Sequence, residues 1–328
     1  MAGTRTRLQH VLRRLLQAVP VILAIVVCNF LLVHLAPGDA ALVLAGEAGS
    51  ATPEYMAQLR AKFQLDRPLA VQLLAYVKSV LMLDLGYSFR HDRPVIELIL
   101  SRLGPTLLLM TTSLVVSVGV GVVLGALGAS ALNSWRDNLI SVFALVSYAT
   151  PLFWLGLMLI VVFALQLGWF PTSGMESIGA FHEGWRRVRD VAWHLALPAA
   201  TLSLFFVALY TRLMRASLLE QRGLEYVTAA RAKGLSERRV LLRHVLRNAI
   251  LPVVTMAGVQ AGNLVGGSVI VETVFGWPGL GLLAFQSLFA RDLNLLLGIF
   301  LLCACTVVLI NLVVDLLYTV VDPRIEAR

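Results

Sequence analysis

The most regular feature of the chain is a series of long apolar stretches. Six of them run for about 20 residues or more without Asp, Glu, Lys or Arg, which is the length that a helix needs to cross ~30 Å of hydrocarbon. They show no alternation of apolar and polar positions with period two, so they predict spanning helices rather than the strands of a membrane barrel. The six windows are Leu15–Ala36, Leu103–Leu132, Leu139–Thr172, Ala192–Thr211, Asn248–Val271 and Leu293–Val314.

A seventh uncharged window, Thr273–Ala290, has a different character. Its first half contains Gly276, Pro278, Gly279 and Gly281, and residues of these two types interrupt a regular helix. We therefore expect this window to form a re-entrant or interfacial segment, and we expect six spanning helices in all.

Positive charges are distributed unevenly among the segments that connect the windows. With the N-terminus inside, the inner segments hold sixteen Lys and Arg residues, whereas the two short outer loops hold four. An excess of positive charge on the inner side is the orientation signal of membrane proteins, so we expect both termini in the cytoplasm. The four outer residues are Arg186, Arg187, Arg189 and Arg291.

The windows and the charges together predict an order of segments. Within the long outer region, Thr52 followed by Pro53 marks the expected start of a helix. The predicted segments are a cytoplasmic N-terminus at 1–14, a first transmembrane helix at 15–36, an extracytoplasmic loop region at 37–102, a five-helix core at 103–320 that includes a cytoplasmic loop at 212–247, and a cytoplasmic tail at 321–328.

Composition agrees with an all-α integral membrane protein. Hydrophobic residues make up 58% of the chain, charged residues make up 14%, and the mean hydropathy is +0.81. The net charge of +8 belongs mainly to the orientation signal and carries no interleaved aromatic residues on a soluble domain, so we expect no nucleic-acid partner. The cysteines Cys28, Cys303 and Cys305 all lie within apolar windows and predict neither a disulfide nor a metal site.

Motifs for catalysis and nucleotide binding are missing from the sequence. There is no Gly-x-x-x-x-Gly-Lys-[Ser/Thr] loop for a nucleotide phosphate and no His-Glu-x-x-His pair for a metal. The run Gly86-Tyr87-Ser88 is only half of a nucleophile elbow, because Arg90 stands where the second glycine is required. We therefore expect no catalytic residue, no metal site and no cofactor in this chain, and any ATP has to be handled by a partner.

Two polar residues lie close together near the end of the last apolar window. Asn311 and Asp315 are four residues apart and therefore share a helix face. An ionisable residue at membrane depth is a functional candidate by default. Asp315, however, is about one turn from Val320, near enough to the interface to reach water. We expect the pair to form a helix-packing hydrogen bond rather than a proton relay.

A strongly basic segment connects the fourth and fifth windows. Between Arg212 and Arg247 it holds nine basic residues and three acidic ones. Such a segment can serve as a topology signal alone, but a run of alanines here predicts a helix with little bulk, which suits close contact with a groove on a partner. Gly234 can end that helix with a left-handed turn. The residues expected to form this docking element are Glu225, Tyr226, Ala229, Ala230, Arg231, Lys233 and Gly234.

A second helix is expected directly after the docking element. Ser236 is a suitable N-cap, and Glu237–Arg247 alternates apolar and basic residues with helical spacing. The apolar positions of this second helix are Val240, Leu241, Val245 and Leu246.

These residues resemble a known family. The segment Glu225–Gly234 is similar to the E-A-A loop of binding-protein-dependent ABC transporter permeases, although Thr228 stands where that loop has its glutamate. The rest of the chain is similar to the dipeptide/oligopeptide/nickel permease family, to the subunit type with a long first outer loop. Besides the loop, the resemblance is carried by Leu35–Asp39; by Leu65–Leu69 with Asp84–Ser88; by Val274–Gly281 with Arg291 and Asp292; and by Asn311–Asp315 with Tyr318 and Asp322–Ile325.

The resemblance implies an ABC importer permease of the type I fold that works within a larger assembly in a bacterial inner (cytoplasmic) membrane. The implied partners are a second homologous permease subunit, two ABC ATPase subunits that bind ATP and Mg²⁺, an extracytoplasmic solute-binding protein and membrane lipid. One ATPase would receive Glu225–Gly234 in a groove. The implied substrate is a di- or oligopeptide, while the same family also serves glutathione, nickel complexes and some oligosaccharides.

Two other classes of function would leave different patterns. A self-contained carrier or channel would show polar residues clustered at mid-membrane and would need no docking helix. An intramembrane enzyme would show a Ser/His or metal constellation. The sequence has neither pattern, which favours the importer permease.

The charge distribution makes a topology prediction. Single cysteines introduced at Ser236 and Ala327 should react with a membrane-impermeant thiol reagent only from the cytoplasmic side, and cysteines at Ser50 and Gly179 only from the outside, because the excess of Lys and Arg marks the inner segments. Labelling of Ala327→Cys from the outside would mean that Thr273–Ala290 spans the membrane, and the six-helix topology would be wrong.

Overall fold

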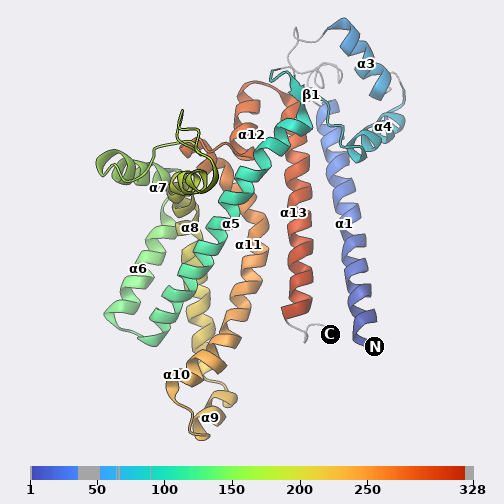
Figure 1. The fold of residues 1–328 in the computed structure, drawn as a ribbon. Helices are drawn as coiled ribbons and strands as arrows, with labels where there is room; N and C mark the ends of the chain where they lie inside the picture. The colour runs from blue at the N-terminus through green and yellow to red at the C-terminus, as the bar shows by residue number, and fades with distance from the viewer. Residues whose placement is uncertain (1, 36–51, 64, 66, 89, 322–328) are drawn as a thin grey trace. The chain divides into compact units, whose positions relative to one another are not determined.

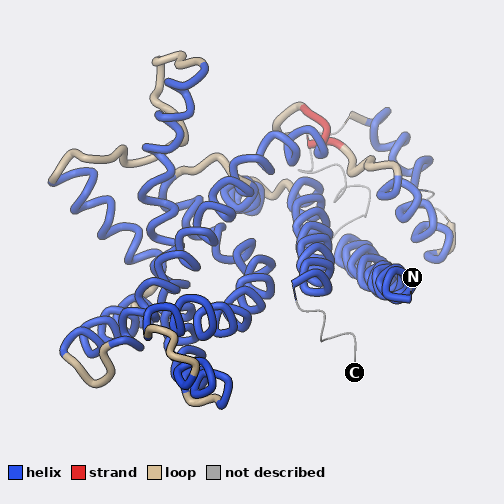
Figure 2. The backbone as a smooth tube through the Cα atoms, turned by 60° about the horizontal axis from the view of Figure 1, so that its bottom comes forward, coloured by secondary structure: helices blue, strands red, loops and turns tan. Residues whose placement is uncertain are grey.

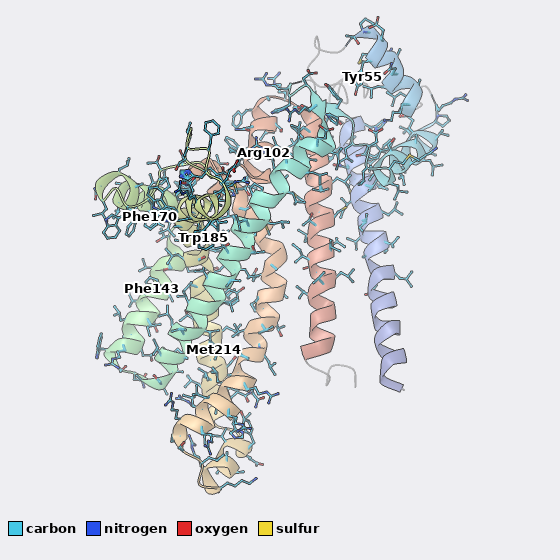
Figure 3. All side chains as sticks on the ribbon, viewed as in Figure 1. Tyr55, Arg102, Phe143, Phe170, Trp185 and Met214 are labelled. Atoms are coloured by element: carbon cyan, nitrogen blue, oxygen red, sulfur yellow. The ribbon has the colours of Figure 1, made fainter. Side chains whose placement is uncertain are left out.

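The computed structural model shows an almost entirely helical chain, which confirms the all-α prediction (Figures 1 and 2). Contacts divide the chain into two compact units, one formed by Met1–Thr106 with Pro278–Arg328 and the other by Leu107–Trp277. The structure describes residues 2–35, 52–63, 65, 67–88 and 90–321.

The first unit contains a pair of long helices and a set of shorter elements. Helices α1 and α13 lie side by side (Figure 1), and the Asn29 side chain of α1 donates to the Leu297 carbonyl of α13 at 3.0 Å. Helix α12 packs against α13. The elements of this unit, besides the start of α5, are α1 (Ala2–Leu35), α3 (Pro53–Phe63), α4 (Leu69–Leu81), β1 (Tyr87–Ser88), β2 (Arg93–Pro94), α12 (Leu280–Phe289) and α13 (Leu293–Val321).

A buried polar contact joins the short antiparallel β1–β2 pair to the start of α13. The Ser88 hydroxyl donates to one carboxylate oxygen of Asp292, and the other oxygen accepts the Leu295 N–H at 3.1 Å, which caps the helix. His91 Nδ1 lies 3.1 Å from Ser88 Oγ. Because the hydroxyl proton is directed at the carboxylate and not at the imidazole, the three side chains form a structural cap rather than a catalytic triad.

The second unit is built around α8, which is buried along much of its length. Helices α6, α7 and α11 pack against α8, and the shared core includes Leu202, Tyr210 and Met214. The elements of this unit are the remainder of α5 (Val95–Ser130), α6 (Trp135–Ala149), α7 (Leu152–Leu159), the π-helix η1 (Ile160–Gln166), α8 (Gly184–Arg222), α9 (Glu225–Ala232), α10 (Glu237–Arg239), the π-helix η2 (Val240–Val245) and α11 (Leu246–Phe275).

Glycines on α5 allow its backbone to approach α8 closely. A Cβ added at Gly125 would lie 2.6 Å from the Thr211 carbonyl oxygen and 2.7 Å from Met214 Cβ, and one added at Gly121 would lie 2.5 Å from Tyr210 Cβ. Small residues serve this purpose in membrane helix packing, where van der Waals contact replaces the hydrophobic effect. The α5–α8 contact is therefore close and has no room for larger side chains at these positions.

Four helices in the described part of the chain are long and apolar enough to cross a membrane, and two pairs of helices separated by a break raise the number to six if each pair is one span. The described apolar stretch of α1, Leu16–Leu32, is shorter. The four helices are Val95–Ser130, Gly184–Arg222, Glu237–Gly262 and Leu293–Val314.

The third predicted window, Leu139–Thr172, is not one straight helix. Its helical part divides into Trp135–Ala149 and Leu152–Gln166, which are bent by 107° relative to each other. The break falls at Thr150, whose backbone is extended (φ −78°, ψ 128°), because the proline that follows it disfavours the helical conformation.

The break predicted at the start of the seventh window is confirmed. Helix α11 ends at Phe275, and Gly276 adopts the left-handed conformation with φ +58°, which glycine reaches without a steric penalty. Helix α12 begins only at Leu280.

The glycine contacts predict a stability difference between two variants of α5. Gly125→Ala should lower the apparent melting temperature of the purified protein in detergent, since overpacking of a filled contact costs about 1–3 kcal/mol and the obstructing atoms include backbone. Gly119→Ala is the matched control, because nothing lies within 4 Å of a Cβ built at this position. Equal melting temperatures for the two variants would contradict the close α5–α8 contact.

Candidate functional site

The predicted docking residues lie together on α9 and on the turn that follows it. Figure 1 shows α9 and α10 at one end of the second unit, beyond the ends of α8 and α11. Glu225, Tyr226, Ala229, Ala230 and Arg231 belong to α9 itself. Lys233 and Gly234 form its C-terminal turn.

The start and the end of α9 have local causes. Leu224 has an extended backbone (φ −81°, ψ 149°) and Glu225 stands in the first turn, where a negative charge interacts favourably with the helix dipole. At the other end the Lys233 N–H donates to the Ala229 carbonyl at 3.2 Å. Gly234 then takes φ +77°, which confirms the predicted left-handed turn.

One face of α9 packs on the protein's own core. Val227 is 0% exposed and Ala230 is 6% exposed, and both belong to the same cluster as Val240 and Val245 of η2. Ala230 therefore supports the position of α9 from inside and does not lie on the surface that a partner can approach.

The opposite face of α9 is exposed and nearly free of bulky groups. Glu225, Thr228, Ala229 and Ala232 are exposed, and three of these four side chains are small. A helix that is seated on a packed core and presents small side chains outward can enter a narrow groove with little loss of side-chain entropy.

An ion pair connects α9 to the next helix. Arg231 Nε donates to Glu237 Oε1 at 2.7 Å, and a second Arg231 nitrogen donates to Oε2 at 3.2 Å. This hydrogen bonding, together with the negative charge of Glu237, raises the pKa of Arg231 above its ordinary value. The two side chains also border a groove of about 360 Å³ whose other charged lining residues are Arg222 and Arg238.

The second predicted helix, Glu237–Arg247, does not end at Arg247. The chain is helical from Glu237 through α10 and η2 into α11, which continues to Phe275. Ser236 precedes this run with an extended backbone but makes no side-chain cap bond. The apolar face was predicted correctly, because Val240 and Val245 are buried. The helix continues because no glycine or proline interrupts it before Pro252, which lies inside α11.

The remaining predicted residues lie elsewhere in the chain. Asn311 is exposed on α13, and the Asp315 side chain lies outside the described residues, so their predicted hydrogen bond stays a prediction. Among the side chains that the structure describes, no group of three or more His, Cys, Asp or Glu residues is arranged to hold a metal ion.

The sequence analysis missed three buried acids, which are Asp137, Asp190 and Glu272. Asp137 is 3% exposed and forms a bidentate ion pair with Arg215, 78 positions along the chain; only the pattern of Ser134 followed by Asp137, which resembles a capping box, could have drawn attention to it. Glu272 is 0% exposed and falls between the fifth and seventh apolar windows, so an acid flanked by two apolar runs was the available signal.

Comparison with family models covers nearly the whole chain. Residues 121–327 match the family described as "Binding-protein-dependent transport system inner membrane component". Residues 7–111 match the companion family, "Binding-prot-dependent transport system membrane comp, N-term".

Curated relatives agree with this match. The chain is 38% identical over 316 residues to a putative peptide transport system permease protein of Brucella abortus, covering 96% of this chain and 98% of that protein. It is 42% identical over 321 residues to the glutathione transport system permease protein GsiC of Salmonella paratyphi A, covering 98% and 100%.

A chain of the MetNI methionine ABC transporter, in an inward-facing structure, superposes with a TM-score of 0.56 at 18% identity, covering 69% of this chain and 97% of that one. The shared fold confirms the expected importer-permease architecture. The chain therefore belongs to the family of binding-protein-dependent transport system inner membrane components, and it is a transport permease subunit rather than an enzyme.

Proposed function

We propose that this chain forms half of the translocation pathway of an ATP-driven importer of short peptides, and that α9 is the element through which a partner ATPase drives it. The observation that carries the proposal is the two-sided character of α9. Val227 and Ala230 fix the helix to the core, while Thr228, Ala229 and Ala232 leave a small-residue surface exposed. A helix that is packed in this way can transmit a displacement, because it cannot move unless the core residues that it contacts move with it.

The same proposal assigns the other parts of the assembly. A second, homologous permease subunit completes the pathway, two ATPase subunits bind ATP and Mg²⁺ on the cytoplasmic side, and an extracytoplasmic binding protein delivers the solute. Both termini lie in the cytoplasm of a bacterial cell with this chain in its inner membrane. Asn311 and Asp315 serve helix packing. The absence of a nucleotide phosphate loop from the sequence and the match to a binding-protein-dependent family support this arrangement.

The substrate class follows from the relatives. The curated proteins at 38% and 42% identity are named for peptide and glutathione transport, and glutathione is itself a tripeptide. We therefore assign short peptides as the solute. Calorimetry with the partner binding protein should show binding of di- and oligopeptides or glutathione; binding of a nickel complex or an oligosaccharide alone would contradict the assignment.

The two faces of α9 predict opposite outcomes for neighbouring alanines. Ala229→Asp should leave membrane abundance and melting temperature unchanged but weaken retention of the ATPase subunits during affinity purification, because an unpaired charge enters a close contact at a cost of ~1–3 kcal/mol. Ala230→Asp should instead lower the melting temperature, because Ala230 is buried in this chain.

Ala180→Asp provides the control for the added charge, since Ala180 is exposed in a different loop of the same unit. It should retain the ATPases at the wild-type level. Full retention and wild-type uptake in the Ala229→Asp complex would show that the basic segment acts only as a topology signal.

The activity of the purified chain by itself distinguishes the importer from a self-contained carrier. The purified chain alone should hydrolyse no ATP and move no solute in liposomes, because it lacks a phosphate-binding loop, whereas the complex with its permease, ATPase and binding-protein partners should do both. Solute flux driven by an ion gradient through the lone chain would favour the carrier and contradict the proposal.

A further inference from the structure

The Asp137 carboxylate accepts several hydrogen bonds and connects the turn between α5 and α6 to α8. Asp137 accepts hydrogen bonds from Arg215 Nε and from a second Arg215 nitrogen, both at 2.8 Å, and from the Asn133 N–H at 3.1 Å. Its side chain is 4% exposed, and that of Arg215 is 31% exposed. A bidentate pair with so little solvent contact is among the stronger and more directional polar interactions in proteins.

Helix α5 contributes to the same junction. A Cβ added at Gly128 would lie 3.2 Å from Asp137 Oδ1, so the carboxylate sits directly against the α5 backbone. One residue further, the Ala129 carbonyl accepts a hydrogen bond from Arg222 at 2.7 Å. Arg215 and Arg222 are seven positions apart, about two helical turns, and so lie on one side of α8. Three helices therefore meet at two arginines of α8.

The junction lies next to the docking element. Arg222 belongs to the last turn of α8 and lines the groove that Arg231 and Glu237 also border. Only Gly223 and Leu224 separate α8 from α9. Along the chain, Arg222 is therefore the nearer of the two arginines to α9, and Arg215 lies about two helical turns further away.

We propose that Asp137, with Arg215, is a positioning residue for energy coupling: the pair makes α5 and α6 move together with α8 when the ATPases displace α9. The inference rests on the proposed function. The glycine packing between α5 and α8, and the hydrogen bond that the Ser203 hydroxyl donates to the Ser113 carbonyl at 3.1 Å, join only those two helices. The bidentate pair fixes the orientation of α6 as well. Loss of the pair should leave the docking surface intact and interrupt the step that follows docking.

Asp137→Asn tests the proposal in the full importer complex reconstituted in liposomes. The amide preserves the shape of the side chain and leaves Arg215 without its counter-charge. We expect the ATPase subunits to remain bound and to hydrolyse ATP, while the amount of solute moved per ATP falls by about tenfold, within the usual 5–150-fold range of allosteric coupling.

Arg215→Lys provides a second variant that does not depend on the first. It keeps the positive charge but cannot reproduce the two parallel bonds of the guanidinium, so a smaller decrease in the same ratio is expected. If Asp137→Asn does not reach the membrane, Arg215→Lys decides the question. In the double variant, the fold decrease in solute moved per ATP should be smaller than the product of the two single fold decreases, because both substitutions remove the same interaction.

Glu176→Gln is the matched control. Glu176 accepts two hydrogen bonds from Arg187, near the opposite end of α8. This pair is more exposed than Asp137 and Arg215, because the Arg187 side chain is 60% exposed and the Glu176 side chain is 39% exposed. It should leave the solute-to-ATP ratio unchanged. A role of Asp137 in stability alone would lower the melting temperature and abundance without changing the ratio for the complexes that assemble.

The outcomes separate the two proposals. If the wild-type complex moves solute with ATP and both Asp137→Asn and Arg215→Lys show the wild-type ratio, the coupling inference is wrong and the proposed function stands. If the wild-type complex moves no solute with ATP, the proposed function is wrong, and the inference that rests on it is wrong as well.

Discussion

A backbone in hydrocarbon must satisfy its own hydrogen bonds, because no water is available to do so, and this requirement governs the two breaks within the candidate membrane spans. At the first break, both the N–H and the hydroxyl of Thr150 donate to the Val146 carbonyl, at 3.1 and 2.7 Å. At the second, the Trp277 N–H donates to the Glu272 carbonyl at 2.9 Å. At both breaks, these donors therefore remain paired where the chain turns.

Buried charged groups must likewise be paired with hydrogen-bond donors. Two acidic side chains that are buried in the second unit, Asp137 and Asp190, each accept several hydrogen bonds, as a buried carboxylate requires. Near the start of α8, Asp190 accepts the N–H and the hydroxyl of Ser177, both at 2.7 Å. Near its end, Arg215 holds Asp137. Helix α8 is therefore fastened at both ends to other segments of its unit, and it is also the most extensively buried of the candidate spans.

Under the proposed function, this arrangement allows a short helix to transmit movement to the rest of its unit. Helix α9 has only eight residues, too few for stability in isolation, and it depends on Val227, Ala230 and the Arg231–Glu237 pair for its position. The exposed small residues then need no further ordering when a partner approaches. Under the proposed function, the inner face supplies stability and the outer face recognition, so a substitution can change one property without the other.

Much of this protein could be predicted from local patterns. Uncharged runs of sufficient length predicted the helical membrane fold. Gly234 marked the left-handed turn after α9, because glycine adopts it without strain. Gly276 and the Gly and Pro residues that follow it marked the break after α11, and the sequence lacks the usual phosphate-binding loop. Each of these properties depends on residues that are close together along the chain, and their types and spacing can be read directly from the sequence.

Only the tertiary structure decided which face of each helix is buried in the protein and which face is exposed. Ala229 and Ala230 are chemically identical, yet one is exposed and the other is buried, because the burial of a residue depends on the surface that a distant segment brings to it. Asp137 and Arg215 are 78 positions apart, and no local pattern indicates their pairing. The sequence by itself determined the elements and their ends, whereas the contacts between helices decided what those elements can do, because such contacts are set by distances in space and not by spacing along the chain.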